Sequence, residues 1–544
     1  MIDWTVHLPI LPVVIPLLAG GMLIIIKDSR RYTRLTLSFI SVGLQLLIAM
    51  RLLAITAGAA PDDWPNNIAV YLLGDWPAPF GIVVVVDRLS AIMLTLSAFL
   101  GTAALMYSTA RWDRAGVHFL ALLQFLLMGL NGAFITGDLF NLFVFFEILL
   151  AASYGLMLHG SGEMRVTAGL HYIAINLLAS LLLLIAIALI YGVTGTLNLA
   201  DLARRAGELQ LGDRHLFEAA AAILGVAFMI KAAAWPLNFW LPSAYSHACP
   251  PVAALFAVMT KVGIYALVRV GSLLVPTGAP AAFGGEWMFP VGLATLLFGT
   301  IGLLSAYQVE RVVSYCVLIS SGTLLSALGM PGVAMTGPAL FYLVSSVLAT
   351  AAFYLLVEMV ERTRKVGADI LAVSMEAFDL EDSDPPDQAG VVVGVAIPAA
   401  MAFLGMSFIA SALLITGLPP LSGFVAKFSL LSAAFQTSDT APGMAAWLLV
   451  SVVLISSLAG IIALVRTGIR LFWANETVTP HLRIAEAVPV AALVFAGVGL
   501  AIWAGPILSF MNDTALSLSH PNLYVDAVLD HNSDRKINTK VLLP

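Results

Sequence analysis

Four ionisable residues lie within long apolar stretches of the chain: Glu147, Lys231, Lys261 and Lys427. A charged side chain at the centre of a bilayer costs about 2.5–3.5 kcal/mol on insertion scales, so such residues are rarely kept without a use. A buried lysine that has a carboxylate nearby can take up and release a proton near neutral pH. One acid and three lysines at membrane depth therefore predict a relay of proton-transferring groups.

Glu147 is expected to pair with Lys231, and a proton that reaches a neighbouring group would change this pairing. Glu147 lies nine residues after Asp138, which is about 13 Å along a helix. The alternative is a static ion pair, with lysines whose amines reach the membrane surface. It explains Lys261 and Lys427 poorly, because both have long apolar flanks on either side.

Three other polar residues are weaker candidates. His247 opens the segment that contains Lys261 and could pass protons to it, although a histidine that only satisfies a helix end explains it equally well. Glu358, near the end of its segment, is expected at the membrane interface. Asp87 is expected to anchor the start of a helix.

The composition is that of an integral membrane protein with many helices. Of 544 residues, 60% are hydrophobic and only 11% are charged, and the mean hydropathy is +0.97. Water-soluble domains are about one quarter charged, so a soluble, disordered or nucleic-acid-binding protein is excluded as the main interpretation. The two cysteines, Cys249 and Cys316, are expected to be buried thiols. No motif for a cofactor, a metal ion or a catalytic nucleophile is found, which argues against a stand-alone enzyme.

The elements that must position these residues are membrane-spanning helices, which need roughly 20 mostly apolar residues each. This criterion predicts about fourteen segments. With the N-terminus outside, most loop Lys and Arg residues fall on the inner side, as the positive-inside rule requires. The segments lie near residues 8–26, 33–55, 81–107, 116–135, 138–158, 166–192, 216–240, 251–274, 287–309, 312–332, 336–360, 391–436, 445–474 and 485–510.

Two predicted crossings are interrupted. Proline removes backbone hydrogen bonds and glycine loosens a helix, and lipid cannot satisfy the freed carbonyls. Breaks at matching places in two halves predict an inverted-repeat transporter whose ion path passes the breaks; two ordinary proline kinks are the alternative. The first break contains Lys231-Ala-Ala-Ala-Trp-Pro236, and the second contains Thr416-Gly417-Leu-Pro419-Pro420-Leu-Ser-Gly423.

Two polar stretches lie between the apolar segments. Thr196–Glu208 predicts a short amphipathic helix at the outer surface, with a plain loop as an equal alternative. Asp369–Gln388 is strongly acidic, and it predicts a solvated inner loop or a docking surface for another subunit.

Four motifs resemble the antiporter-like subunits shared by respiratory complex I and the multisubunit Mrp (Pha, Sha) cation/proton antiporters. The resemblance covers roughly residues 80–475, and the chain length and the tail after Thr514 are most similar to the D-type subunit of the Mrp complexes. The motifs, in this order, are Phe145-Phe-Glu147, Lys231-Ala-Ala-Ala-Trp-Pro-Leu-Asn-Phe-Trp-Leu-Pro242, Thr260-Lys261-Val-Gly-Ile-Tyr-Ala-Leu and Gly417-Leu-Pro-Pro-Leu-Ser-Gly-Phe-Val-Ala-Lys427.

The resemblance implies an all-α polytopic membrane protein of about fourteen helices, with two inverted five-helix repeats that each contain a broken helix. It also implies a Glu147–Lys231 pair and a central hydrated lysine row with Lys261 and Lys427. One departure lies in the tenth predicted helix, which reads Ile319-Ser-Ser-Gly-Thr323 where many relatives have a histidine.

These features lead to one expected function and two alternatives. We expect a proton-translocating subunit of a Na⁺/H⁺ or K⁺/H⁺ antiporter complex in a bacterial inner membrane, with other antiporter subunits as partners and no cofactor. The runner-up is a proton-pumping subunit of a redox complex of the complex I or membrane-bound hydrogenase type, and a scaffold with degenerate charges is third. The chain is expected to divide into N-terminal helices (1–110), a first repeat (111–274), a second repeat (275–474) and a last helix with a tail (475–544).

Overall fold

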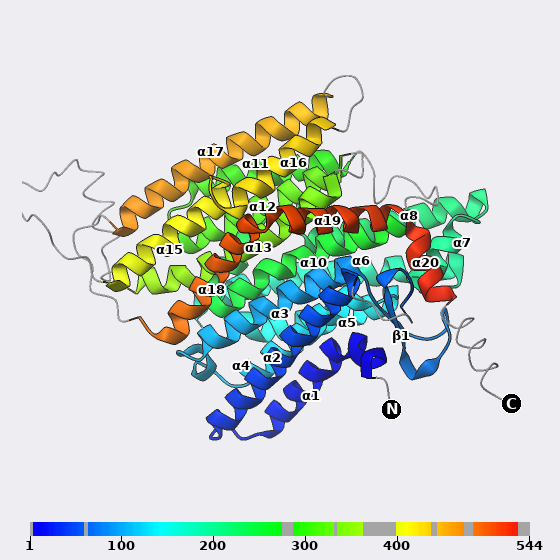
Figure 1. Ribbon diagram of the computed structural model, residues 1–544, viewed down its shortest axis with the longest axis horizontal. Coiled ribbons are helices and arrows are strands. Elements are labelled where there is room, and N and C mark those ends of the chain that lie inside the picture. Colours follow the sequence, from blue (N-terminus) through cyan, green and yellow to red (C-terminus); the bar gives the residue numbers. More distant parts are fainter. Residues whose placement is uncertain are drawn as a thin grey trace, which may run out of the picture.

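The structure, a computed structural model, describes residues 4–58, 64–160, 162–274, 287–330, 335–362, 399–436, 443–472 and 482–530. Long helices run side by side across the molecule (Figure 1). The helices up to residue 274 are α1 (Leu11–Ile25), α2 (Arg31–Thr56), α3 (Arg88–Ser108), α4 (Phe119–Ile135), α5 (Leu139–Met157), α6 (Glu163–Thr194), α7 (Leu199–Ala206), α8 (Leu211–Lys231), α9 (Trp240–His247) and α10 (Pro250–Leu274). The later helices are α11 (Met288–Ser305), α12 (Val309–Leu328), α13 (Thr336–Glu361), α15 (Ala399–Thr416), α16 (Ser422–Gln436), α17 (Met444–Phe472), α18 (Ile484–Ile502), α19 (Ala504–Ser519) and α20 (Pro521–Leu529).

Twelve helices within the described ranges are long and apolar enough to span a membrane. The other two of the fourteen predicted segments contain α4, which has 17 residues, and the interrupted pair of α8 and α9. Each predicted segment therefore contains a helix, and the prediction of an all-α polytopic membrane protein is confirmed.

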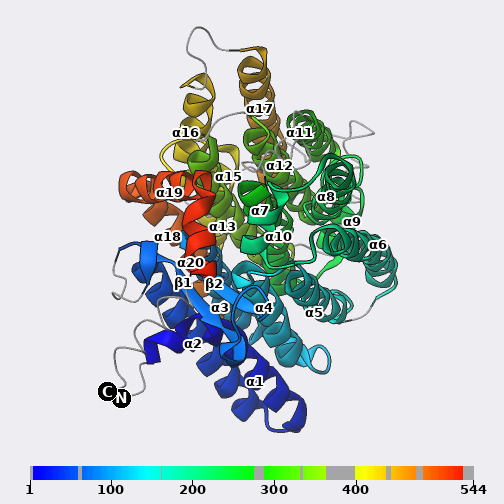
Figure 2. The same ribbon diagram turned by 90° about the vertical axis from the view of Figure 1, so that its right-hand side faces the viewer.

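The helices differ in how much of their surface the protein covers. Seen along the helices, α10 and α13 lie in the middle of the molecule, whereas α1, α6 and α17 lie at its periphery (Figure 2). Within the most apolar stretch of each helix, 94% of the residues of α10 and 89% of those of α13 are buried, against 39% in α6 and in α17. A helix that is apolar all round and buried belongs to the core of a large bundle, so Lys261 on α10 lies in the least accessible part of the fold.

One predicted boundary is wrong, because the segment expected as a helix from residue 81 begins with a strand. Strand β2 (Val83–Val86) pairs antiparallel with β1 (Ala69–Leu72), and α3 begins only at Arg88. Four consecutive valines are β-branched and favour an extended backbone over a helix. The hairpin packs near the start of α5, since Gly137 N donates to the carbonyl oxygen of Val83 at 2.9 Å.

The predicted amphipathic helix is present as α7, within Thr196–Glu208. The side chain of Asn198 caps it by accepting hydrogen bonds from two backbone amides, as an N-cap residue does. The apolar face of α7 packs against α10 and α20. The acidic stretch Asp369–Gln388 lies outside the described residues.

Candidate functional site

The first interrupted helix ends at Lys231, the last residue of α8. Residues 232–239 are irregular, Ala233 has a left-handed backbone with φ 55°, and α9 restarts at Trp240. The amide of Trp235, which the break frees, donates to Oγ1 of Thr295 on α11 at 2.8 Å. The predicted break at Pro236 is therefore present, and its backbone is partly satisfied by a neighbouring helix rather than by lipid.

Glu147 and Lys231 lie near each other without forming a direct ion pair. Oε1 of Glu147 and Nζ of Lys231 are both shielded from solvent, and neither atom has a hydrogen-bond partner among the described residues. Nζ of Lys231 lies 5.2 Å from the ring centroid of Phe146, the residue before Glu147. The two charges are close enough to act on each other, so their interaction is electrostatic and is not locked by a hydrogen bond.

A small cavity is lined by Lys231. It has a volume of about 20 Å³ and is also lined by Trp240, Tyr245 and Thr260. Nε1 of Trp240 and the hydroxyl of Tyr245 are buried without a hydrogen-bond partner in the described part of the chain, as is the lysine amine. A space of this size holds about one water molecule, and water is the partner that three such polar groups require.

Lys261 lies on α10 and is only 1% exposed. Its Nζ donates to Oγ of Ser321 on α12 at 2.9 Å. Ser321 belongs to the stretch Ile319-Ser-Ser-Gly-Thr323. A hydroxyl group therefore occupies the position next to the lysine amine.

The second interrupted helix holds its lysine more firmly. α15 ends at Thr416, Gly417 has a left-handed backbone with φ 77°, and α16 begins at Ser422. Nζ of Lys427 reaches back across the break and donates to the carbonyl oxygen of Thr416 and to Oγ of Ser457, both at 2.9 Å. A cation at the carbonyl end of a helix is favoured by the helix dipole.

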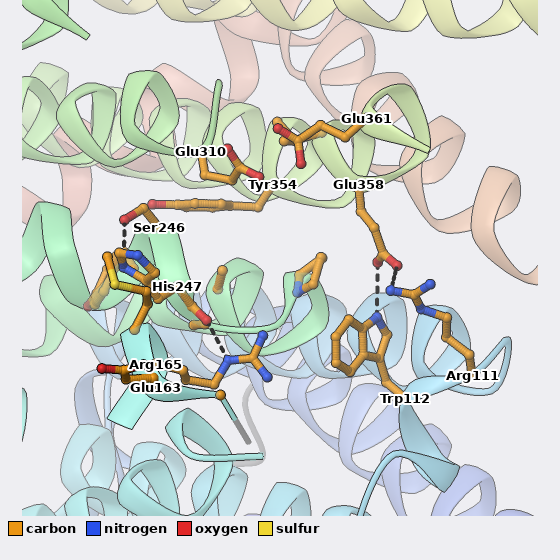
Figure 3. Close-up of a pocket in the computed structure, with 17 residues that line it drawn as sticks. Arg111, Trp112, Glu163, Arg165, Ser246, His247, Glu310, Tyr354, Glu358 and Glu361 are labelled. Carbon is orange, nitrogen blue, oxygen red and sulfur yellow. Dashed lines mark hydrogen bonds and ion pairs between the residues drawn. The ribbon is translucent and has the colours of Figure 1, made fainter. Parts of the chain in front are cut away.

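A polar pocket of about 460 Å³ lies where α9 ends and α10 begins (Figure 3). Nδ1 of His247 donates to the carbonyl oxygen of Ser243 at 2.7 Å, which leaves Nε2 as the nitrogen that can accept a proton. Nε of Arg165 donates to the carbonyl oxygen of His247 at 2.7 Å. Lys261 lies eleven residues into α10, about 17 Å along that helix, so His247 does not adjoin it.

Glu358 is a residue whose environment the sequence did not reveal. It is buried at the edge of the same pocket, where Oε1 pairs with Arg111 at 2.6 Å and Oε2 accepts a hydrogen bond from Trp112 (Figure 3). Oε2 also accepts a hydrogen bond from the hydroxyl of Tyr107. Tyr107 and Glu358 are 251 positions apart. No local pattern signals a contact over that separation, so only the fold brings these groups together.

Asp87 anchors the start of α3, as predicted, and it also forms a buried ion pair. Its carboxylate accepts hydrogen bonds from the amide of Ser90 at 3.0 Å and from Arg269 of α10 at 2.5 Å. Burial opposes ionisation of Asp87, but the charge and hydrogen bonds of Arg269 outweigh it and lower the pKa of the carboxyl group. This pair ties α3 to α10 at the hairpin side of the molecule.

The cysteines are free and buried, as predicted. In the loop between α9 and α10, burial raises the pKa of Cys249 to about 12, so its thiol stays protonated and unreactive. Across the described ranges, no three His, Cys, Asp or Glu side chains lie together in a way that could hold a metal ion.

Comparison with known proteins places this arrangement in a family. Residues 136–459 match the family described as NADH:quinone oxidoreductase/Mrp antiporter, TM. The probable D-type K(+)/H(+) antiporter subunit of Rhizobium meliloti (strain 1021) is 51% identical over 539 residues, covering 97% of this chain and 98% of that protein. The D-type Na(+)/H(+) antiporter subunit of Alkalihalophilus pseudofirmus is 32% identical over 530 residues, covering 96% of this chain and 99% of that protein.

Solved structures agree with the sequence match. A chain of the Mrp complex from Dietzia sp. DQ12-45-1b has a TM-score of 0.81 and 28% identity, covering 96% of this chain and 99% of that chain. A chain of respiratory complex I from Thermus thermophilus shares the fold, with a TM-score of 0.72 and 22% identity over 95% and 99% of the two chains. The protein therefore belongs to the NADH:quinone oxidoreductase/Mrp antiporter transmembrane family, among the homologues of the D-type Mrp antiporter subunits.

Proposed function

We propose that the protein is a subunit of a K⁺/H⁺ or Na⁺/H⁺ antiporter complex and that it moves protons through Glu147, Lys231, Lys261 and Lys427. The names of its relatives support the antiporter class, because the two described above are D-type subunits of a K(+)/H(+) and a Na(+)/H(+) antiporter. A secondary transporter subunit rather than an enzyme fits this assignment. Partners are other antiporter subunits of a hetero-oligomeric membrane complex, as the match to a chain of an Mrp complex suggests.

The observation that carries the proposal is the amine of Lys231. It is buried at a helix break beside a small cavity, without a hydrogen-bond partner in the described ranges and with the charge of Glu147 nearby. An amine held only by electrostatics and water changes its proton occupancy when a neighbouring charge changes. Uptake of a proton near Glu147 then weakens the hold on Lys231 and favours release of its proton toward Lys261.

Access from one face of the molecule is part of the proposal. Tyr245 lines both the polar pocket and the small cavity at Lys231. Protons would enter the pocket, where Nε2 of His247 can accept them, and pass Tyr245 to the water site at Lys231. His247 thereby acts as a relay toward Lys231 rather than toward Lys261.

The proposal also includes the arrangement of the repeats and the orientation of the chain in the membrane. Two inverted repeats at residues 111–274 and 275–474 would each contain one break, flanked by the N-terminal helices 1–110 and the last helix with its tail 475–544. The pocket would open on the inner side of a bacterial inner membrane, with the N-terminus outside, because the loops on the pocket side are rich in Arg.

Antiport in everted membrane vesicles that contain the whole complex tests the proposal. Glu147→Ala and Lys231→Ala are expected to reduce cation-induced proton efflux to background while the subunits still copurify. Lys27→Ala, which removes an exposed lysine in the loop after α1, is the matched control and is expected to leave antiport unchanged. Near-normal antiport in either relay variant would refute the assigned roles. Intact transport after alanine substitution at each of the four proposed relay positions, Glu147, Lys231, Lys261 and Lys427, would favour a scaffold.

A redox-linked complex is the second candidate, because the matched family also covers NADH:quinone oxidoreductase. Composition of the purified native complex separates the two. Small membrane subunits without iron–sulfur proteins support the antiporter, whereas iron–sulfur or quinone-reductase subunits and NADH-driven proton uptake support the redox complex.

A further inference from the structure

The aromatic ring of Phe146 lies next to the amine of Lys231 at the first helix break. Nζ of Lys231 lies over this ring, 5.2 Å from its centroid. A cation within about 6 Å of a ring centroid is attracted by the negative potential of the ring face. Phe146 is fully buried, so bulk water does not screen the attraction. The ring is therefore a binding partner for the ammonium group, although the two form no hydrogen bond.

No hydrogen bond competes with this contact. Among the described residues, Nζ of Lys231 has no hydrogen-bond partner. Trp240 lines the same small cavity, but its indole N–H is a donor only and cannot accept a hydrogen bond from an ammonium group. The hydroxyl of Tyr245, which also lines this cavity, is itself without a partner there. In the described part of the chain, the ring of Phe146 is therefore the group that holds the ammonium by direct contact.

A second ring fixes the orientation of Phe146. Phe146 on α5 packs against Phe228 on α8 in a T-shaped arrangement, with centroids 6.2 Å apart and ring planes at 89°. Phe228 lies three residues before Lys231 on α8, so both side chains lie on the same face of that helix. Phe228 is also fully buried, and close packing leaves such side chains little room to change rotamer. One face of α8 therefore presents both the cation and the ring that orients its partner.

The other two deep lysines are held in a different way. Lys261 donates a hydrogen bond to Oγ of Ser321. Lys427 donates to the carbonyl oxygen of Thr416 and to Oγ of Ser457. A neutral amine keeps its N–H groups and can still donate to an oxygen, whereas a ring face attracts the charged form and makes only a weak contact with a neutral N–H group. An oxygen acceptor therefore holds a lysine in either protonation state, but a ring face holds only the protonated one.

We propose that Phe146 is a positioning residue that holds the amine of Lys231 at the first break only while this amine is protonated. The inference rests on the proposed proton-translocating function and deepens it, because it states how the loss of a proton becomes a movement. When the amine releases its proton, its positive charge is lost and the attraction to the ring ends, so the side chain can leave the ring. When a proton returns, the ring attracts the ammonium again. Phe146 thereby links the protonation state of Lys231 to its position.

Fluorination of the Phe146 ring tests the inference with little change in shape. Fluorine withdraws electrons and weakens the negative potential of the ring face, so phenylalanine with one, two or three ring fluorines is incorporated at position 146 of the whole complex. Antiport in everted vesicles is measured against pH. Its alkaline limb is expected to move stepwise to lower pH, because the protonated amine is stabilised less. Phe146→Leu removes the ring face and is expected to move the limb by about one pH unit.

The matched control is Phe217, a fully buried phenylalanine on α8 that forms no cation–π contact within the described ranges. Phe217→Leu and the same fluorinated residues at position 217 are expected to leave the pH profile in place. Copurification of the subunits shows that each variant assembles, and the fluorinated variants decide the question if Phe146→Leu does not.

Two outcomes would overturn the inference and are distinguishable. If the fluorinated variants at position 146 assemble and keep the wild-type pH profile, or lose activity equally at every pH, while Lys231→Ala abolishes antiport, the role of the ring is wrong and the lysine relay stands. If Lys231→Ala retains antiport, the proposed function fails and the inference fails with it.

Discussion

The two helix breaks present the same kind of residue in opposite states. Lys231 and Lys427 are equally buried, 7% and 8% exposed, and each lies next to an interrupted helix. Lys427 donates two hydrogen bonds, to Thr416 and Ser457, whereas the amine of Lys231 has no hydrogen-bond partner within the described ranges. Both breaks therefore carry a buried lysine. Only at the second break is the lysine amine held by hydrogen bonds to the protein.

The difference shows where a proton-dependent change can start. Breaking the contacts of Lys427 leaves the carbonyl oxygen of buried Thr416 without this donor, which costs about 1–3 kcal/mol. Ser457 is only half-buried and adds little to this cost. Lys231 has no such contacts to lose, and its position depends on the charge of Glu147 and on the ring of Phe146. We infer that the first break responds to protonation and that the second break passes on the charge it receives.

The largest loss of stability is expected where a buried charge is fully paired, at Asp87 and Arg269. Asp87→Asn is expected to destabilise the protein by about 3–5 kcal/mol, because it leaves the guanidinium of Arg269 buried without its counter-charge. Thermal unfolding of the complex in detergent measures this loss.

The pH dependence of this variant has a definite sign. The pKa of Asp87 is lowered in the folded protein from its usual 3.8, so the stabilisation is complete above about pH 4 and is lost as the pH falls through the lower, folded pKa. The stability gap between wild type and Asp87→Asn is expected to stay constant from pH 7 to 5 and to shrink below pH 4. A gap that widens on acidification would contradict the ionised pair.

Methionine at each lysine position sharpens the contrast between the breaks. Lys427→Met is expected to lower stability by about 1–3 kcal/mol, since the Thr416 carbonyl and Ser457 lose their donor. Lys231→Met removes an unpartnered buried amine and is expected to leave stability unchanged or higher, although antiport falls to background. Unfolding temperature and antiport are measured on the same preparations, and an equal loss of stability in both variants would remove the distinction drawn above.

The backbone at the two breaks gives the smallest expected effects. Gly417 has φ 77°, and a Cβ there would lie 2.6 Å from Cδ of Lys427. Gly417→Ala is therefore expected to cost about 1–2 kcal/mol of backbone strain and to shift the lysine, which slows antiport in part. In the first break, Ala233→Gly relieves a left-handed alanine at φ 55° but removes a buried methyl group worth about 0.8 kcal/mol. Its net effect on unfolding is expected to stay within about 1 kcal/mol, and a large loss would show that the first break is also rigid.

Hydropathy and residue type along the chain were enough to locate the spanning helices, both breaks and the four deep ionisable residues. These are local properties, because a span needs a length of apolar sequence and a break needs proline or glycine within it. The same rule misplaced the start of the third segment, where four valines form strand β2 rather than a helix turn. Apolar content alone does not distinguish a strand from a helix over so short a run.

The partners of the deep residues were decided by tertiary packing. Ser321 is 60 positions from Lys261, and Glu358 is 251 positions from Tyr107. The sequence around a serine does not reveal whether its hydroxyl forms a hydrogen bond within its own helix or with a neighbouring helix. Local sequence therefore predicted which groups could carry a proton. The packing of α10, α12, α13 and α16 determined which hydroxyls and amines are in contact. Contacts between helices depend on the relative positions of the helices and not on the residues of either helix taken alone.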